Sequence, residues 1–433
     1  MFKRILTIAC GVALGLCLAA GLVAGAARLA SALGILPHRD ISRASAYVRD
    51  VMSLVSDNYY DPQKAAAPDL ARAALHGMVE SLDPHSEFME ARDFAALNED
   101  MSSEFGGIGL QVESRKGRVY VVAPVKDAPG ERAGIRAGDE ITSIDGVKLD
   151  KPGIDSVVEK LRGKPGTKVT VGLFRASENR EFSAALIREK IKNQSVSNVR
   201  VLEGGVGYLL ITQFTERTGD EFIDALNQLA GRNATSLIID LRNNPGGVLE
   251  SAVAVAEPFF KKGELIVYTQ GRAAADRDEY RAESDDEPVT APVAILINQN
   301  SASAAEVVAG ALKDTGRAVI VGERSFGKGS VQSVYELDNG DGLRLTTARY
   351  HTPGGETIHE HGVAPQIEVV LTAGEDDNIA AQLARPDLAD APAAFKERFE
   401  TDPVPDRQLQ AALGALQGVT ALERLEPRAA RSR

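Results

Sequence analysis

The chain has 433 residues, of which 44% are hydrophobic and 25% are charged, so it has the composition of a globular protein long enough for two or three domains. Its formal net charge of −12 disfavours a nucleic-acid-binding protein, which usually carries a basic face, and a protein held on anionic lipid by charge. The two cysteines, Cys10 and Cys17, both lie in the first twenty residues, so the body of the chain contains no cysteine.

A basic and then apolar stretch begins the chain. Lys3 and Arg4 precede an apolar run from Ile5 to Ala27, the pattern of a signal peptide or of an uncleaved membrane anchor within residues 1–36. Small residues near the end of the run would suit cleavage, whereas its length would suit an anchor, so both alternatives stand. Either one predicts export to the periplasm or to the extracytoplasmic side of the inner membrane.

Residues 37–103 have the pattern of short helices. Apolar residues recur at helical intervals between Ile41 and Met78, and Pro62 and Pro84 interrupt them. We therefore expect a small N-terminal helical segment.

Residues 104–187 predict a β-rich module. Strands such as Arg118–Val125 and Lys168–Phe174 are separated by glycine-containing turns, and one short helix is expected within Asp127–Ile141. A module of this size is within the usual range for a domain.

Residues 188–372 alternate between strands and helices. The expected strands are short, nearly continuous apolar runs, namely Gly205–Thr212, Thr235–Asn243, Ala291–Asn298 and Arg317–Gly322. The expected helices between them are Gly219–Ala230, Glu250–Phe260 and Ser303–Asp314. Apolar strands covered on both faces indicate an α/β sheet core. Residues 373–433 are expected to add a helix at Asp406–Leu422, which packs on the core, and a solvated tail.

The stretch Val321–Val331 contains G-x-x-x-x-G-K, from Gly322 to Lys328, and so approaches a phosphate-binding P-loop. A P-loop needs Ser or Thr after the lysine and a helix after the loop. Here Gly329 follows the lysine, and the next residues are β-branched and aromatic, typical of a strand. The sequence disfavours a phosphate site and leaves two alternatives for Lys328, a solvated surface lysine or a catalytic one.

Ser301 and Ser303 lie at a predicted turn between a buried strand and a helix. Free backbone N–H groups and the positive end of the helix dipole favour negative charge there, which suits a hydroxyl attacking a carbonyl. A serine at this position can also simply cap the helix. Both roles fit if one serine caps and the other reacts.

A serine nucleophile needs a base, and the histidines do not supply one by sequence pattern. None lies in the signature of a Ser-His-Asp hydrolase; the six are His38, His76, His85, His351, His359 and His361. A Ser-Lys pair is the alternative, provided that the lysine is neutral. Lys328, between glycines and beside Phe326, could be desolvated. Gln332, four residues later on the same face of the expected strand, could hydrogen-bond its amine without adding charge.

The segment Asp240–Glu250 predicts a glycine-bearing turn after a strand. Gly246 and Gly247 could aim a backbone N–H at a developing oxyanion, and the N–H of Ala304 could be the second donor. A plain turn is the alternative, because Asn-Pro and Gly-Gly mark loops in any protein.

At these residues the chain resembles the carboxy-terminal processing proteases, also called tail-specific proteases. Matching segments run in the family's order from about Ser81 to Val370: LDPHSEFM, FGGIGLQV, AGIRAGDEI, LRGKPGT, DLRNNPGG, NSASAAEVVAGALKD, VGERSFGKGSVQ and TTARYHTPGGETI. The resemblance implies a serine endopeptidase with a Ser-Lys dyad. It makes Ser303 the nucleophile, Lys328 the base and Gln332 the group that positions the lysine, and it lines the oxyanion hole with Gly246 or Gly247 and Ala304.

The resemblance also implies the fold. It predicts an α/β multidomain protein whose crotonase/ClpP-like α/β protease core holds an inserted β-rich PDZ domain, with helical N- and C-terminal segments. Gly107, Ile108, Gly109 and Leu110 match the carboxylate-binding loop of the PDZ domain, where a peptide adds as a strand. Arg162 lies where family members carry an arginine linked to PDZ-to-protease signalling.

No metal or cofactor is expected. His361 is a departure from the family pattern, and His359 and His361 alone are too few to form a metal site. The expected partners are proteins or peptides with free, apolar C-termini. The apolar run within residues 1–36 allows membrane attachment at the N-terminus, and the resemblance allows a homo-oligomer formed through the terminal helical segments.

Three functions are distinguished. The first is an exported, ATP-independent serine endopeptidase that cleaves proteins near their C-termini through an acyl-enzyme, with the PDZ domain binding the substrate C-terminus and gating activity. The second is a catalytically inactive PDZ peptide-binding scaffold. The third, a P-loop nucleotidase, would bind magnesium nucleotides.

Overall fold

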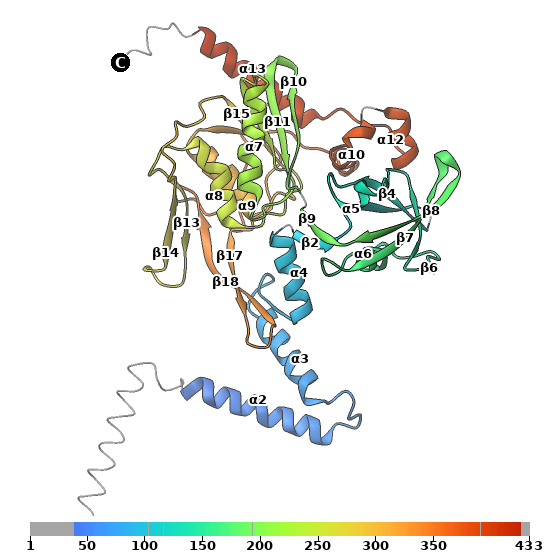
Figure 1. Cartoon of the computed structure of the whole chain (residues 1–433). Coiled ribbons are helices and arrows are strands. Elements are labelled where there is room, and N and C mark those ends of the chain that lie inside the picture. The colour runs from blue at the N-terminus through green and yellow to red at the C-terminus, as the bar shows by residue number, and fades with distance from the viewer. Residues whose placement is uncertain (1–38, 103, 116, 193, 390, 426–433) are drawn as a thin grey trace, which may run out of the picture. The chain divides into compact units, whose positions relative to one another are not determined.

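The computed structural model describes residues 39–102, 104–115, 117–192, 194–389 and 391–425 (Figure 1). The predicted signal peptide or anchor, including both cysteines, lies outside the described residues. Within those ranges no helix is long and apolar enough to span a membrane. The chain divides into two compact units, the first ending at Phe88 and the second beginning at Met89.

The described part of the first unit is mostly helical. Helices α2 (Arg39–Asn58) and α3 (Ala67–Glu80) are followed by the short strand β1 (Glu87–Met89), which spans the boundary between the units. A proline in the first turn of α3 suits a helix start, where no intrahelical N–H is needed. Pro62 and Pro84 both lie outside these helices, as the sequence predicts.

The β-rich module folds as an antiparallel sheet with two small helices. Its strands pair in the order β3-β4-β5-β7-β8, and β2 pairs separately with β9. Alternate residues of β7, such as Val169 and Leu173, are buried in the module's own apolar core, as the period of a half-buried strand requires. The elements are α4 (Ala91–Ser102), which precedes the module, then β2 (Glu104–Gly107), β3 (Leu110–Arg115), β4 (Arg118–Pro124), α5 (Pro129–Arg132), β5 (Glu140–Ile144), β6 (Val147–Lys148), α6 (Ile154–Leu161), β7 (Lys168–Arg175), η1 (Ala176–Glu178), β8 (Arg180–Ile187) and β9 (Glu189–Lys192).

A six-stranded sheet forms the α/β core. The order is β10-β11-β12-β15-β16-β19, with parallel neighbours except for the antiparallel pair β10 and β11. Every residue of β11, β12 and β15 is buried, which fits apolar strands covered on both faces. The elements are β10 (Val196–Leu202), η2 (Glu203–Gly205), β11 (Val206–Ile211), α7 (Thr218–Gly231), β12 (Ser236–Asp240), α8 (Leu249–Ala256), η3 (Glu257–Phe259), β15 (Val293–Ile297), α9 (Ala304–Asp314), β16 (Ala318–Gly322) and β19 (Ile367–Glu368).

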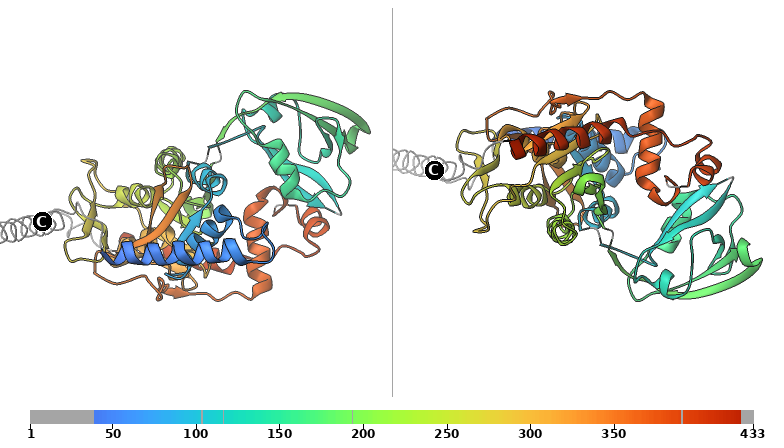
Figure 2. Two further views of the ribbon diagram at one scale, coloured as in Figure 1. Left: turned by 90° about the horizontal axis from the view of Figure 1, so that it is seen from below. Right: turned by 90° about the horizontal axis from the view of Figure 1, so that it is seen from above.

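Two apolar clusters cover the two faces of this sheet. Helices α7, α8 and α9 pack on the face that presents Leu209, Ile239 and Ile295. The opposite face presents the alternate residues, and Ala412 and Leu416 of the C-terminal helix α13 (Arg407–Leu425) pack against it (Figures 1 and 2).

A second, antiparallel sheet lies between the core strands in sequence. Its strands β14, β13, β18 and β17 are neighbours in that order, and they comprise β13 (Leu265–Gln270), β14 (Arg277–Arg281), β17 (Ser330–Glu336) and β18 (Gly342–His351). The C-terminal segment adds α10 (Ala373–Ala384), α11 (Pro386–Ala389) and α12 (Pro392–Phe399) before α13. The predicted α/β multidomain fold class is thereby confirmed.

Candidate active site

Three loops leave the same edge of the six-stranded sheet. They follow the parallel strands β12, β15 and β16 and comprise residues 241–248, 298–303 and 323–329. Ligand sites of open α/β sheets form at the carboxyl ends of the strands, because the connecting loops meet there. The first two loops carry the predicted oxyanion glycines and the predicted nucleophile, and the third carries Lys328.

A cavity of about 550 Å³ brings the predicted residues together. Ser303, Lys328, Gln332, Gly246 and Gly247 all line it. A larger cavity of about 920 Å³ lies elsewhere and contains neither Ser303 nor Lys328, so volume alone does not locate the chemistry.

Ser303 has a strained backbone at the start of α9. Its φ of 55° and ψ of −118° are unusual for a residue with a side chain, a conformation that costs about 1–3 kcal/mol and tends to occur at functional sites. The residue is only 6% exposed, yet its side chain borders the cavity. Two hydrogen bonds to Glu306 maintain this strained conformation. The Ser303 N–H donates to the Glu306 side chain at 2.8 Å, and the Ser303 carbonyl accepts the Glu306 N–H at 2.8 Å.

The Ser301 side chain makes structural hydrogen bonds. Its hydroxyl donates to the Leu241 carbonyl at 2.8 Å and accepts the Asn298 N–H at 2.9 Å, and the residue is fully buried. It does not line the cavity. Ser301 therefore links the 298–303 loop to the 241–248 loop. The N-cap position of α9 is occupied by Ser303, not by Ser301.

Glu306 holds the nucleophile and lysine loops together. Each carboxylate oxygen accepts two donors: Oε2 accepts the N–H groups of Ser303 and Lys328, both at 2.8 Å, and Oε1 accepts the Ser325 hydroxyl at 2.5 Å and the Gly327 N–H at 2.7 Å. Burial raises the pKa of this carboxyl, and these four hydrogen bonds act in the opposite direction. Glu306 was not among the predicted site residues, although Ser303 and Glu306 have the spacing of a capping box.

Lys328 lies in the loop before β17, partly buried beside the cavity. Burial lowers the pKa of its amine, and the positive charge of Arg344 lowers it further, while Glu306 raises it. The loop itself is tightly packed, because a Cβ at Gly329 would lie 2.3 Å from the backbone nitrogen of His359. These surroundings favour the neutral amine that a general base requires.

Gln332 lines the cavity but binds elsewhere. Its amide donates to the hydroxyls of Ser330 at 2.9 Å and Thr346 at 3.2 Å. The expectation that Lys328 and Gln332 share one face of a strand is wrong, because β17 begins only at Ser330 and its register shifts between Val331 and Gln332. The two residues are brought near the cavity by the loop and the bulge instead.

The two glycines of the 241–248 loop have no room for side chains. A Cβ on Gly246 would lie 2.6 Å from the Ser303 Cβ, and one on Gly247 would lie 1.8 Å from the Phe214 carbonyl oxygen. Both have positive φ, 96° and 140°. The Gly246 N–H donates to the Asn244 side chain at 2.8 Å, so of the two glycines Gly247 is the better placed to offer an N–H to the cavity. Ala304 is the first residue of α9, where an N–H has no partner within the helix.

Tyr350 also lines the cavity, although it was not among the predicted site residues. It is 4% exposed, and burial raises the pKa of its hydroxyl to about 12. Hydrogen bonding with the Ser303 side chain acts in the opposite direction. At neutral pH the phenol is therefore protonated, and it can donate a hydrogen bond next to the nucleophile.

Comparison with known proteins places this arrangement in a family. Residues 205–369 match peptidase family S41, and residues 106–186 match a PDZ domain. The chain is 38% identical over 377 residues to a carboxy-terminal-processing protease of Bartonella bacilliformis, an alignment that covers 82% of this chain and 85% of that protein. The chain belongs to peptidase family S41.

A second curated relative agrees with this assignment. The carboxy-terminal processing protease CtpA of Bacillus subtilis is 35% identical over 318 residues, covering 73% of this chain and 67% of that protein. Among solved structures, a photosystem II D1 C-terminal processing protease is 30% identical and covers 74% of this chain and 92% of its own, with a TM-score of 0.42. The family match and the two curated relatives make this S41 protein a serine peptidase of the carboxy-terminal processing protease family, and the match over residues 106–186 makes its β-rich module a PDZ domain.

The PDZ domain of this S41 peptidase has a small groove of about 210 Å³. The groove is lined by the predicted loop, Gly107 to Leu110, and by Arg162 at the end of α6. The Arg162 guanidinium lies 4.6 Å from the ring centroid of Phe105, a cation–π contact at the groove wall. The loop and the arginine singled out in the sequence therefore border one groove.

Within the described ranges of the S41 peptidase, no three His, Cys, Asp or Glu side chains form a group that could hold a metal ion. The Nδ1 of His359 is buried and has no hydrogen-bond partner among the described residues, and its Nε2 lies 3.8 Å from Glu360 Oε1.

Proposed function

We propose that this serine peptidase is an exported endopeptidase that cleaves proteins near their C-termini with Ser303 as nucleophile and Lys328 as base. The observation that carries the proposal is that both side chains line one cavity while both backbones are fixed to the same buried carboxylate, Glu306. The lowered pKa of Lys328 supports the role of base, because only a neutral amine can accept a proton.

The first half of the reaction forms an acyl-enzyme. Neutral Lys328 takes the proton of the Ser303 hydroxyl while Oγ attacks the scissile carbonyl carbon. The N–H groups of Gly247 and Ala304 donate to the oxyanion that develops on the carbonyl oxygen. When the tetrahedral intermediate collapses, the C–N bond breaks, and the Lys328 ammonium gives its proton to the leaving amine.

The second half releases the acyl group. Lys328 is neutral again and takes a proton from water, whose oxygen attacks the ester carbon of the acyl-Ser303. Collapse of this intermediate breaks the ester bond, and the proton returns to the Ser303 oxygen. The cycle consumes one water and needs no nucleotide or metal.

A cleavage assay tests the proposal. The full chain is incubated with an unfolded protein, and the products are identified by mass spectrometry, beside Ser303→Ala and Lys328→Ala variants whose folding is checked by circular dichroism. We expect cleavage by the wild type and none by either variant. Full activity in either variant would contradict the dyad. No cleavage by the wild type would favour the alternative, an inactive PDZ peptide-binding scaffold.

We also propose that the PDZ groove binds the substrate's C-terminal carboxylate and that binding gates the protease. Two observations support a link. Met101, near the end of α4, lines the active-site cavity, and Phe105, four residues later in β2, lines the PDZ groove. A change at the groove therefore has a short covalent route to the cavity. Peptides with a free C-terminus should be cleaved faster than the same peptides with an amidated one.

Export remains part of the proposal. Its support is the sequence of residues 1–36, with two basic residues before an apolar run. A fusion of these residues to alkaline phosphatase, which folds only in an oxidising compartment, should be active. The size of the fusion on a gel would distinguish a cleaved signal from an anchor.

Self-association through the N-terminal helical segment is proposed as well. Helix α2 exposes large apolar side chains, among them Tyr47, Val48 and Leu54. Exposed apolar surface of this kind marks interaction sites. Sedimentation velocity should give a species larger than the monomer, and Leu54→Glu should reduce it.

A further inference from the structure

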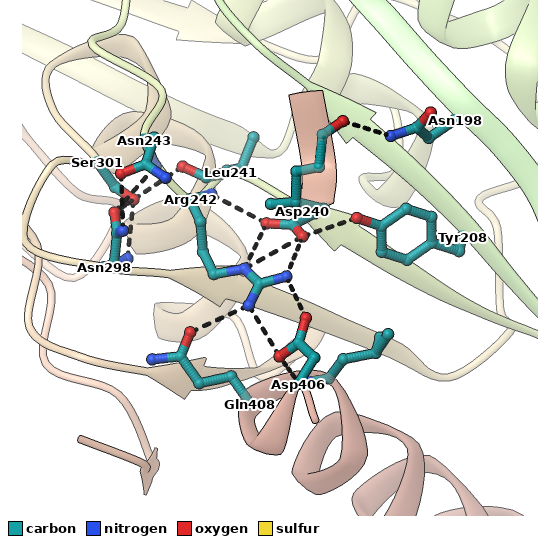
Figure 3. A network of polar contacts seen from close by, with 12 residues as sticks. Asn198, Tyr208, Asp240, Leu241, Arg242, Asn243, Asn298, Ser301, Asp406 and Gln408 are labelled. Carbon is teal, nitrogen blue, oxygen red and sulfur yellow. Dashed lines mark hydrogen bonds and ion pairs between the residues drawn. The ribbon is translucent and has the colours of Figure 1, made fainter. Parts of the chain in front are cut away.

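A buried polar network joins the end of β12 to the start of α13 (Figure 3). Arg242 is at its centre and is 2% exposed. Its Nη2 donates to Asp240 at 2.6 Å and to Asp406 at 2.8 Å, and its Nη1 donates to Asp406 at 3.0 Å and to Gln408 at 3.2 Å. Tyr208 of β11 completes the network by donating to Asp240 at 2.8 Å.

The contact between Arg242 and Asp406 is a two-pronged one, with both carboxylate oxygens bound by the guanidinium. Such bidentate pairs fix orientation as well as distance. Asp406 also accepts the Leu409 N–H at 2.9 Å and so caps α13. Burial alone would lower the pKa of Arg242, but the charges of Asp240 and Asp406 and their hydrogen bonds raise it well above its usual range. The arginine is therefore a permanent cation whose position depends on both aspartates.

Arg242 is the second residue of the 241–248 loop, the oxyanion loop, which carries Gly246 and Gly247. The next residue, Asn243, has a positive φ of 58° and donates its N–H to Asn298 at 2.9 Å. Asn244 then accepts the Gly246 N–H on its side chain and the Ala302 N–H on its carbonyl, at 2.8 and 2.9 Å. A displacement of Arg242 would therefore be passed to Gly247 and to the residue before Ser303.

The C-terminal segment holds this region at a second point. Asp376 of α10 accepts the Asn298 side-chain amide at 3.3 Å, and the same amide donates to Asn243 at 2.9 Å. Neither Asp376 nor Asp406 borders the cavity that contains Ser303. Any effect they have on the reaction must act through the loops.

We infer that Asp406 is a positioning residue for catalysis: through Arg242, the C-terminal segment fixes the 241–248 loop so that the Gly247 N–H meets the oxyanion. The inference rests on the proposed function, because it assumes that this loop supplies an oxyanion donor. It gives the start of α13 a role in positioning the 241–248 loop, in addition to the packing of α13 on the sheet.

The test compares Asp406→Asn with wild type in the full chain. The amide can keep one bond to Arg242 but replaces the other acceptor with a donor. We expect kcat to fall by about 10-fold to 100-fold, toward the loss of one oxyanion donor, and KM to stay within about twofold, because the substrate's ground-state contacts are untouched. Affinity for a peptide boronate, which mimics the tetrahedral state, should fall in parallel with kcat. Asp406→Glu, which restores the charge, should recover part of the loss.

A matched control lies in the same segment. Asp402 is 67% exposed and its carboxylate pairs with Lys396, so Asp402→Asn makes the same chemical change away from the network. Its kcat should equal that of wild type. A fluorophosphonate titration counts competent Ser303 and separates a slower enzyme from a smaller folded fraction.

Several results would overturn the inference. They are a wild-type kcat in Asp406→Asn, a fall explained entirely by fewer titratable sites, or an equal fall in Asp402→Asn. If Asp406→Asn does not fold, Gln408→Met is measured instead, which removes one acceptor from Arg242 and one donor from the Val369 carbonyl. We expect kcat to fall by about threefold to tenfold at constant KM, and an unchanged kcat would count against the inference. The proposed function fails separately, if Ser303→Ala retains activity.

Discussion

At the scale of single residues, the proposed role of Lys328 as a base depends on the protonation state of its amine. Burial and the charge of Arg344 lower the pKa of its amine, so the neutral form becomes available below the usual range of a lysine, about 10.4. The neutral form is the base, so kcat should rise with pH and level off above the lowered pKa. An optimum in acid would contradict this assignment.

Replacing Arg344 with glutamine should move that profile. The change removes a positive charge that lowers the pKa of Lys328, so the pKa rises, and the ascending limb shifts to higher pH by about one unit or less. At pH 7 the rate should fall by up to about tenfold, and high pH should restore it. The measurement is kcat against pH, with Arg349→Gln as control, since Arg349 is an exposed arginine of the same strand. A limb that stays in place or moves to lower pH would refute the role of Arg344.

Glu306→Gln tests the carboxylate that joins the two catalytic loops. Each oxygen accepts two donors, so an amide must turn its NH2 group toward two hydrogen-bond donors in a buried site. This mismatch should lower the free energy of unfolding by about 2 kcal/mol or more and the rate by at least about 100-fold, because one of the two pairs of donors that fix the catalytic loops loses its acceptor. Thermal unfolding and active-site titration measure the two effects. A folded variant with wild-type kcat would remove Glu306 from the site.

At the scale of elements, the loop after β12 can be tested by its glycine. Gly247→Ala introduces a Cβ about 1.8 Å from the Phe214 carbonyl oxygen at a positive φ, so the loop must move away from the cavity. We expect kcat to fall by at least about 100-fold.

The matched change is Gly414→Ala in the interior of α13, where the added Cβ would meet no atom of the described residues within 4 Å. That helix should gain about 0.5–1 kcal/mol of stability, with kcat unchanged. Equal loss of activity in both variants would show that the loop has no special role.

The elements differ in how far the sequence could predict them. Strands β11, β12 and β15 were predictable because each is an apolar run between turn residues, with all residues buried. Gln332 lies in the predicted strand, but its relation to Lys328 was predicted wrongly, because Lys328 precedes β17 and the bulge between Val331 and Gln332 depends on pairing with β18, which no local pattern predicts. The capping-box spacing of Ser303 and Glu306 is visible in the sequence. Three of the four donors to Glu306, however, come from Ser325, Gly327 and Lys328, and the tertiary fold brings their loop close.

At the scale of the whole chain, long-range ion pairs were the least predictable feature. Asp406 lies 164 residues from Arg242, and Arg398 lies 285 residues from Glu113. The sequence correctly predicted a helix near Asp406, because the helical pattern is local. It could not predict what the helix's first residues bind, because charged residues in an acidic, alanine-rich segment have many equivalent partners.

The pair of Arg398 and Glu113 offers a test of gating. Arg398 of α12 donates to Glu113 of PDZ strand β3 at 2.5 and 2.8 Å, and Glu113 also lies 3.3 Å from Arg115. The C-terminal segment thus holds the PDZ domain with Arg398 and the oxyanion loop with Asp406. If gating uses this connection, the preference for a free over an amidated substrate C-terminus should depend on the ion pair.

Charge reversal measures that dependence. Glu113→Lys and Arg398→Glu each place like charges in contact, so each should reduce the ratio of kcat/KM for free and amidated peptides by about fivefold, a coupling of about 1 kcal/mol. The double variant restores opposite charges and should recover most of the ratio. Reversing the exposed pair Lys396 and Asp402 in the same segment controls for charge alone. Single variants with an unchanged ratio, or a double variant no better than the singles, would exclude this ion pair from the gate, because a coupled pair must respond to each loss and to its repair.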